Sequence, residues 1–161
     1  MFTYYIYIYK EIFIKNHPKP WSKDTWKSYR KCIGTREELL LDMGYGKCYL
    51  KDSQIRSIVE ESIEFFHNKR YILHSYVIMP NHVHILFHML GEYLIEKELY
   101  RMKKISALGI NKATGEKGKY WDGQSYCRMI RNQEHYDNVR RYINGNPRFL
   151  RSGEFTIRNF V

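Results

Sequence analysis

The spacing of apolar positions changes along the chain, and each change predicts a different element. Residues 2–14 are β-branched or aromatic almost throughout, with no glycine or proline before Pro18, which predicts one long strand. Prolines, glycines and short basic stretches interrupt residues 15–46, which are predicted to be an irregular insertion. Within it, residues 36–41 could form a helical turn.

Helical spacing of apolar residues appears three times after the insertion. Asp52 or Ser53 is placed to cap a first helix, which should end near residues 67–68. A second helix is predicted from residue 94 to about 110, with one apolar and one basic face. The third runs from near Asn132 to Gly145, because Pro147 disfavours helical geometry at the preceding residue.

Strand-like runs lie between these helices. Residues 71–79 and 83–90 are joined across Pro80-Asn81, a turn dipeptide, which predicts an antiparallel pair. Residues 112–119 contain two glycines and are predicted to form a loop, and residues 125–130 suit a fourth strand.

The predicted order is therefore βαββαβ followed by one helix. This is the α+β, ferredoxin-like split βαβ pattern, an antiparallel sheet with helices on one face, plus an added C-terminal helix. No repeat, low-complexity tract or second domain is evident, so residues 1–161 are expected to form a single domain.

Composition narrows the class of partner. The net charge of +10 favours polyanions, above all nucleic acid, because phosphates that bind cationic side chains release their counterions. No apolar run approaches the roughly 20 residues that span a bilayer, and the N-terminus lacks signal-peptide features, so we expect a cytoplasmic protein with no membrane partner. Cys32, Cys48 and Cys127 are far apart and odd in number, and are expected to be reduced and structural.

Two histidines form the first candidate site. Strand alternation places His82 and His84 on one face and the intervening apolar residues on the other. Two imidazoles at this spacing can bind one divalent cation, although a half-exposed strand that happens to carry histidines is an equally good interpretation. His88 continues the same face. A third ligand has to come from elsewhere, and an oxygen donor would favour a hard cation.

The last helix offers such a donor. Tyr142 and Asn146 are four residues apart, so one helix face would present a phenol and an amide together. A phenol can attack phosphorus once a cation neutralises the phosphate charge, whereas in the simpler interpretation Tyr142 packs and Asn146 ends the helix. Tyr126 and Tyr136 are the rival phenols, but neither has a ligand-capable residue one turn away.

Several basic residues on the predicted helices and the fourth strand are candidates for binding nucleic-acid phosphates. They are Arg101, Lys103, Lys104, Arg128, Arg131, Arg140 and Arg141.

Two separate motifs together resemble the single-tyrosine HUH transposases of the insertion-sequence-200/605 type. They are Tyr76–Leu86 (YVIMPNHVHIL) and Tyr142–Pro147 (YINGNP). Within that superfamily the chain is most similar to the REP-associated tyrosine transposases, whose downstream pattern is echoed by Tyr120-Trp121 and by residues 129–132. The resemblance covers about residues 47–150, and no motif in residues 15–46 contributes to it.

The resemblance implies a ferredoxin-like endonuclease and strand transferase that acts on single-stranded DNA, often beside a hairpin, with Mg²⁺ or Mn²⁺. By analogy His82 and His84 are metal ligands, Asn146 is the third ligand, and Tyr142 is the nucleophile that forms a 5′-phosphotyrosine. Relatives act as dimers or as monomers, so the oligomeric state stays open.

Other functions are also compatible with these motifs. One is a module that binds hairpin DNA or RNA without cutting it, and another is a metal-dependent hydrolase that uses water in place of tyrosine. A replication initiator or relaxase fits less well, because the chain is short and offers one candidate tyrosine.

Overall fold

The computed structural model describes residues 18–25, 41, 43–121, 125, 130 and 132–160. The chain divides into two compact units, Met1–Cys48 and Tyr49–Val161, and the second holds the sheet and its helices. The predicted strand at residues 2–14 lies outside the described residues, as do most of residues 15–46 and 125–130. The full βαββαβ order and the single domain therefore stay predictions.

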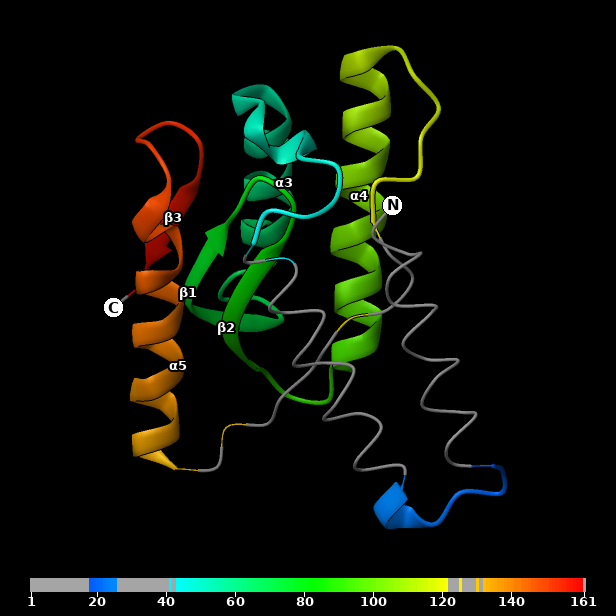
Figure 1. Cartoon of the computed structure of the whole chain (residues 1–161), viewed down its shortest axis with the longest axis vertical. Helices are drawn as coiled ribbons and strands as arrows, with labels where there is room; N and C mark the ends of the chain where they lie inside the picture. Colours follow the sequence, from blue (N-terminus) through cyan, green and yellow to red (C-terminus); the bar gives the residue numbers. More distant parts are fainter. Residues whose placement is uncertain are drawn as a thin grey trace. The chain divides into compact units, whose positions relative to one another are not determined.

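The second unit is an α+β structure (Figure 1). Its elements, in chain order, are η1 (Tyr49–Lys51), α3 (Ser53–Glu64), β1 (Tyr71–Ile78), β2 (Val83–Met89), α4 (Ile95–Thr114), α5 (Gln133–Gly145), η2 (Asn146–Phe149) and β3 (Thr156–Asn159).

Side-chain caps set where two of the helices begin. The carboxylate of Asp52 accepts hydrogen bonds from the backbone N–H groups of residues 54 and 55, as predicted for the start of α3. The amide oxygen of Asn132 accepts from the N–H of His135 at the start of α5, which begins and ends where the sequence predicts.

The other helix ends were predicted less well. Helix α3 ends at Glu64, about one turn before residues 67–68. Helix α4 continues to Thr114, so the prediction of a loop from residue 112 was wrong for its first three residues. The helix continues until Gly115, which has a φ of 71° and ends it in the left-handed conformation.

The described sheet has three antiparallel strands in the order β2-β1-β3. Strands β1 and β2 form the predicted hairpin, which is closed by a 2.8 Å hydrogen bond from Met79 N–H to the His82 carbonyl. Strand β3 was not predicted. It is only four residues long and pairs with β1 across more than 75 residues of sequence, a contact that local patterning does not reveal.

A β-bulge in β1 changes which side chains face each side of the sheet. The register shifts between Leu73 and Ser75, which pair with the consecutive residues Phe87 and Leu86. Because of this shift, Leu73 and Tyr76 both join the larger core, whereas the extra residue, His74, contacts α5.

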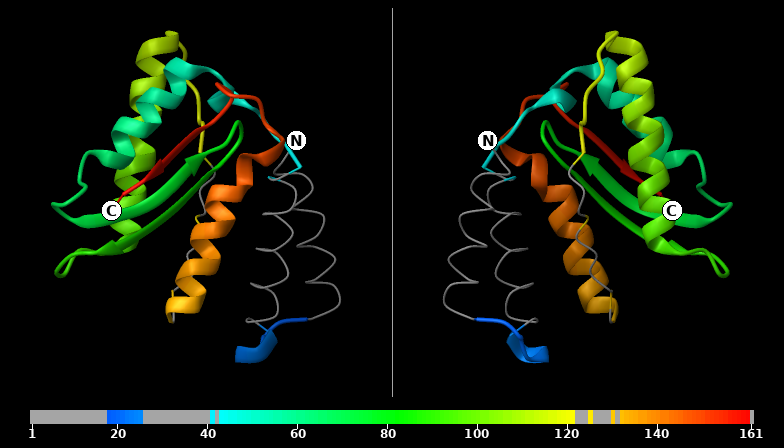
Figure 2. Two further views of the ribbon diagram at one scale, coloured as in Figure 1. Left: turned by 90° about the vertical axis from the view of Figure 1, so that its left-hand side faces the viewer. Right: turned by 90° about the vertical axis from the view of Figure 1, so that its right-hand side faces the viewer.

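Helices cover both faces of this sheet (Figure 2). On one face α3 and α4 pack over a core that includes Val59, Tyr71 and Ile110. On the other, α5 packs over a smaller core of Val77, Met79, Leu86 and Ile143. The prediction of helices on one face holds for α3 and α4, and the added helix that carries Tyr142 covers the opposite face.

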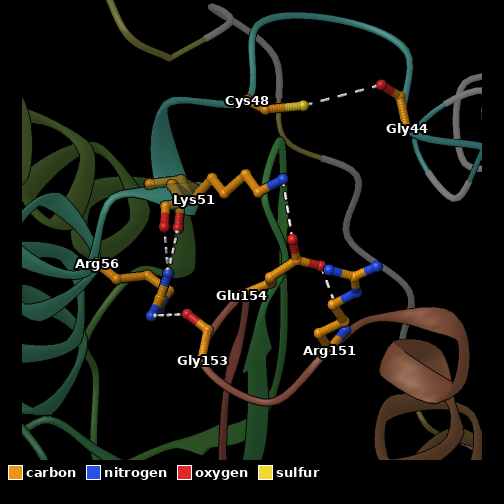
Figure 3. A network of polar contacts seen from close by, with 8 residues as sticks. Gly44, Cys48, Lys51, Arg56, Arg151, Gly153 and Glu154 are labelled. Atoms are coloured by element: carbon orange, nitrogen blue, oxygen red, sulfur yellow. Dashed lines mark hydrogen bonds and ion pairs between the residues drawn. The ribbon is translucent and has the colours of Figure 1, made fainter.

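The buried guanidinium of Arg56 joins the start of the unit to its C-terminal segment (Figure 3). It donates to the carbonyls of Leu50 and Lys51 at 2.9 Å, and to the Gly153 carbonyl at 2.6 Å. Its Nε donates to Thr156 Oγ1 at 3.2 Å. Arg56 thus holds the loop that precedes β3 against α3.

Candidate functional site: two histidines and a tyrosine

The hairpin places the two candidate ligand histidines beside each other. His82 lies in the turn just before β2 and is 6% exposed, and His84 is the second residue of the strand. Both imidazoles lie on the α5 side of the sheet, because Val83 and Ile85 pack into the core under α3 and α4. The predicted alternation of faces is confirmed.

The ring nitrogens of this pair converge. His82 Nε2 and His84 Nε2 are 3.0 Å apart, and His82 Nδ1 lies 2.7 Å from the amide oxygen of Asn81. Since that oxygen can only accept, His82 Nδ1 carries the proton and, in the neutral ring, Nε2 presents a lone pair toward His84. Two nitrogens this close either share a proton or ligate one cation. Nitrogens in adjacent positions on a cation, each about 2.1 Å from it, are themselves roughly 3 Å apart.

Helix α5 brings a phenol to the same point. Tyr142 Oη lies 3.5 Å from His84 Nε2, and the two rings meet edge to face with centroids 5.1 Å apart. Tyr142 is 38% exposed, and the contact of its hydroxyl with His84 lies in an exposed part of the site. The next residue, Ile143, is 2% exposed and anchors the helix in the smaller core.

Asn146 follows one turn later. Helix α5 ends at Gly145 as predicted, yet Asn146 keeps helical dihedrals, with φ −59° and ψ −44°. The expectation that Pro147 would prevent this was wrong, because Asn146 begins the 3₁₀ turn η2 and Pro147 is its second residue, in the first turn, where a missing N–H is tolerated. Tyr142 and Asn146 therefore lie on a continuous helical path, four residues apart.

A second polar cluster occupies the same face of the sheet. His74 Nε2 lies 2.9 Å from His88 Nδ1, and Tyr136 Oη on α5 lies 3.2 Å from His74 Nδ1. Burial, His88 and Arg140 lower the pKa of His74 below its usual value, which favours the neutral ring. The rival Tyr136 thus contacts this cluster, whereas Tyr142 contacts His84. Tyr126 lies outside the described residues.

The basic candidates fall into separate groups. Arg140 and Arg141 lie on α5 with Tyr142, and Arg141 is exposed and donates to Asn138 at 2.6 Å. The other described candidates, Arg101, Lys103 and Lys104, lie on α4, across the sheet from Tyr142. Arg128 and Arg131 lie outside the part of the chain that the structure describes.

The candidate arginine on α4 already has an acidic partner within the fold. Arg101 forms an ion pair with Glu98, which is 1% exposed and also accepts from Arg70 at 3.3 Å. Lys104 is exposed beside Tyr100, with its ammonium 6.0 Å from the ring centroid.

Other potential ligands are few. Among the described residues, no three or more His, Cys, Asp or Glu side chains gather in a way that could hold a metal ion. A cation at His82 and His84 would thus need a different donor, and the Asn146 amide is the predicted one. The contact of Asn81 with His82 could not be predicted from the sequence, although Pro80-Asn81 was predicted to form the turn.

The antiparallel sheet, the paired histidines and the adjacent helical tyrosine define a candidate site for metal-assisted phosphoryl transfer. A family model described as "Transposase IS200 like" matches residues 44–146, well over half of the chain. The chain belongs to this family. Membership indicates a transposase, a DNA-processing enzyme that binds DNA.

No curated protein and no solved structure shows significant similarity to the chain. In the described part of the molecule, no helix is long and apolar enough to cross a membrane.

Proposed function

We propose that the protein cleaves and rejoins single-stranded DNA through a covalent bond to Tyr142. The observation that carries the proposal is the position of the Tyr142 hydroxyl, 3.5 Å from an imidazole nitrogen that itself lies 3.0 Å from a second one. A substrate beside a DNA hairpin and the REP-associated subtype belong to the same proposal, and they rest on the sequence resemblance.

The donor set fits a divalent cation, Mg²⁺ or Mn²⁺, held by His82, His84 and Asn146. The hydrogen bond of His82 Nδ1 with Asn81 supports this assignment, because it places the proton on Nδ1, so that Nε2 presents its lone pair toward His84, and it fixes the ring orientation. When bound, the cation would supply positive charge that offsets the charge of the scissile phosphate.

The chemistry of the chain itself is the attack by the phenol. Tyr142 Oη forms a bond to phosphorus as the bond from phosphorus to the 3′-oxygen breaks, so a 5′-phosphotyrosine and a free 3′-hydroxyl result. The phenolic proton leaves to solvent, and the departing 3′-oxygen takes one up. One phosphodiester replaces another, so a second 3′-hydroxyl can reverse the step without ATP.

The decisive experiment compares two tyrosines on one helix. Wild type, Tyr142→Phe and Tyr136→Phe are incubated with Mn²⁺ and labelled single-stranded oligonucleotides covering the hairpins beside the gene, and covalent adducts are separated on a denaturing gel. We expect Tyr142→Phe to abolish the adduct and Tyr136→Phe to retain it. Cutting without an adduct in all three proteins would make water the nucleophile, and binding without cutting would favour the binding module.

A parallel comparison tests the metal ligands. His84 and His88 lie on the same strand and the same face, but only His84 faces both His82 and Tyr142. We expect His84→Ala to weaken Mn²⁺ binding, measured by titration calorimetry, by about tenfold or more, and His88→Ala to leave it unchanged. Equal Mn²⁺ affinity in both variants would show that His84 is not a ligand of the cation.

A further inference from the structure

The most exposed large apolar side chain among the described residues follows the site directly. Phe149 is 85% exposed and ends η2, three residues after Asn146. The chain is anchored on both sides of Phe149: Pro147, two residues before it, is buried, and Leu150, the next residue, packs against the smaller core. The turn therefore holds the ring outward, where it gains almost nothing from folding.

The helical path places Phe149 on the same side as the site residues. From Tyr142 to Phe149 the chain makes one turn of α-helix and one of 3₁₀-helix, which advances it by roughly 12 Å and leaves the two residues about 40° apart around the axis. That advance is short enough for a DNA strand whose phosphate lies at Tyr142 to bring a neighbouring base to Phe149.

The guanidinium of Arg148 lies over the Phe149 ring. The Arg148 guanidinium carbon lies 4.7 Å from the Phe149 ring centroid, and both side chains are exposed. Planar guanidinium and aromatic groups together suit a nucleotide, because the ring stacks on a base while the cation meets a phosphate.

A similar pair elsewhere offers a matched control. Phe65, 60% exposed at the end of α3, has the Lys69 ammonium 5.7 Å from its ring centroid. Helix α3 packs on the face of the sheet opposite α5, so this pair does not continue the Tyr142 helix.

We propose that Phe149 and Arg148 form a stacking platform for an unpaired base next to the scissile phosphate. This inference rests on the proposed function for its orientation toward Tyr142. It makes Phe149 a positioning residue, which holds the strand in line while Tyr142 reacts. Stacking tolerates any base, so the platform contributes affinity for single strands without reading their sequence.

The test measures binding without chemistry. Fluorescence anisotropy with a labelled 20-nucleotide oligothymidylate in EDTA gives Kd for wild type, Phe149→Ala, Phe149→Tyr and Phe65→Ala. We expect Phe149→Ala to raise Kd about tenfold, Phe149→Tyr to restore near wild-type affinity, and Phe65→Ala to have little effect. The thermal midpoint of Phe149→Ala should equal that of wild type, because the ring is exposed.

The outcomes separate the two proposals. Unchanged binding by Phe149→Ala, or an equal loss in Phe65→Ala, overturns the platform even if the Tyr142 adduct forms. A selective loss in Phe149→Ala supports the platform even if no adduct is found, in which case the proposed cleavage fails alone.

Discussion

At the scale of single residues, one inserted position decides the environment of a histidine. The bulge between Leu73 and Ser75 turns His74 toward α5, where it meets Tyr136 and His88. Without that extra residue, strand alternation would place the following side chains on the wrong faces. The bulge therefore creates a polar contact between β1 and the helix that carries Tyr142.

This contact predicts a pH dependence of stability. Burial, His88 and Arg140 lower the pKa of folded His74, so protons bind the unfolded chain more readily. Neutral His74 thus contributes to the free energy of unfolding above about pH 6.5, the usual histidine pKa. This contribution is lost as the pH falls below that value. We expect urea unfolding to show a larger loss of stability from pH 7.5 to 5.5 in wild type than in His74→Gln. Identical losses would contradict this.

At the scale of elements, Arg56 on α3 connects η1, a few residues before it, to the segment before β3, which lies 97 residues later at Gly153. Its donors satisfy carbonyls at η1 and before β3, so removing the guanidinium leaves buried polar groups without partners. The Lys51–Glu154 ion pair, 2.9 Å long, joins the same segments at the surface. The Arg56 hydrogen bonds and this ion pair should contribute differently to the free energy of unfolding.

Substitutions of Arg56 and of Lys51 test this difference. We expect Arg56→Met to lower the free energy of unfolding by roughly 3 kcal/mol, because several charged hydrogen bonds are lost from a buried site. Lys51→Met should have a much smaller effect, because the lysine side chain is 61% exposed and water screens the pair. Chemical denaturation measures the free energy of unfolding of both variants. Equal effects would show that Arg56 does not stabilise the contact between these segments more than the ion pair does.

At the scale of the whole molecule, charge governs binding to DNA. The chain has a net charge of +10, and each phosphate that it neutralises contributes about −0.7 to the slope of log K against log salt for single strands. We expect a slope steeper than about −2 for oligothymidylate, or at least about a tenfold loss of affinity from 50 to 200 mM NaCl. Anisotropy at several salt concentrations measures the slope, and a value near zero would exclude electrostatic binding.

Features that depend on neighbouring residues could be predicted from the sequence. The Asp52 cap, the start of α5 near Asn132, the β1–β2 hairpin and the apolar alternation around His84 all follow from short-range rules, and the structure confirms them. The motifs in Tyr76–Leu86 and Tyr142–Pro147 were sufficient to suggest the transposase family, which the family model confirms.

Contacts between distant segments became apparent only in the folded structure. Local patterning could not show that β3 pairs with β1, that a bulge turns His74 toward α5, or that Tyr142 reaches His84 while Tyr136 reaches His74. Each depends on the register of one strand and on which face of the sheet a helix covers. Packing of the whole unit selects both, because a one-residue shift would exchange buried and exposed side chains.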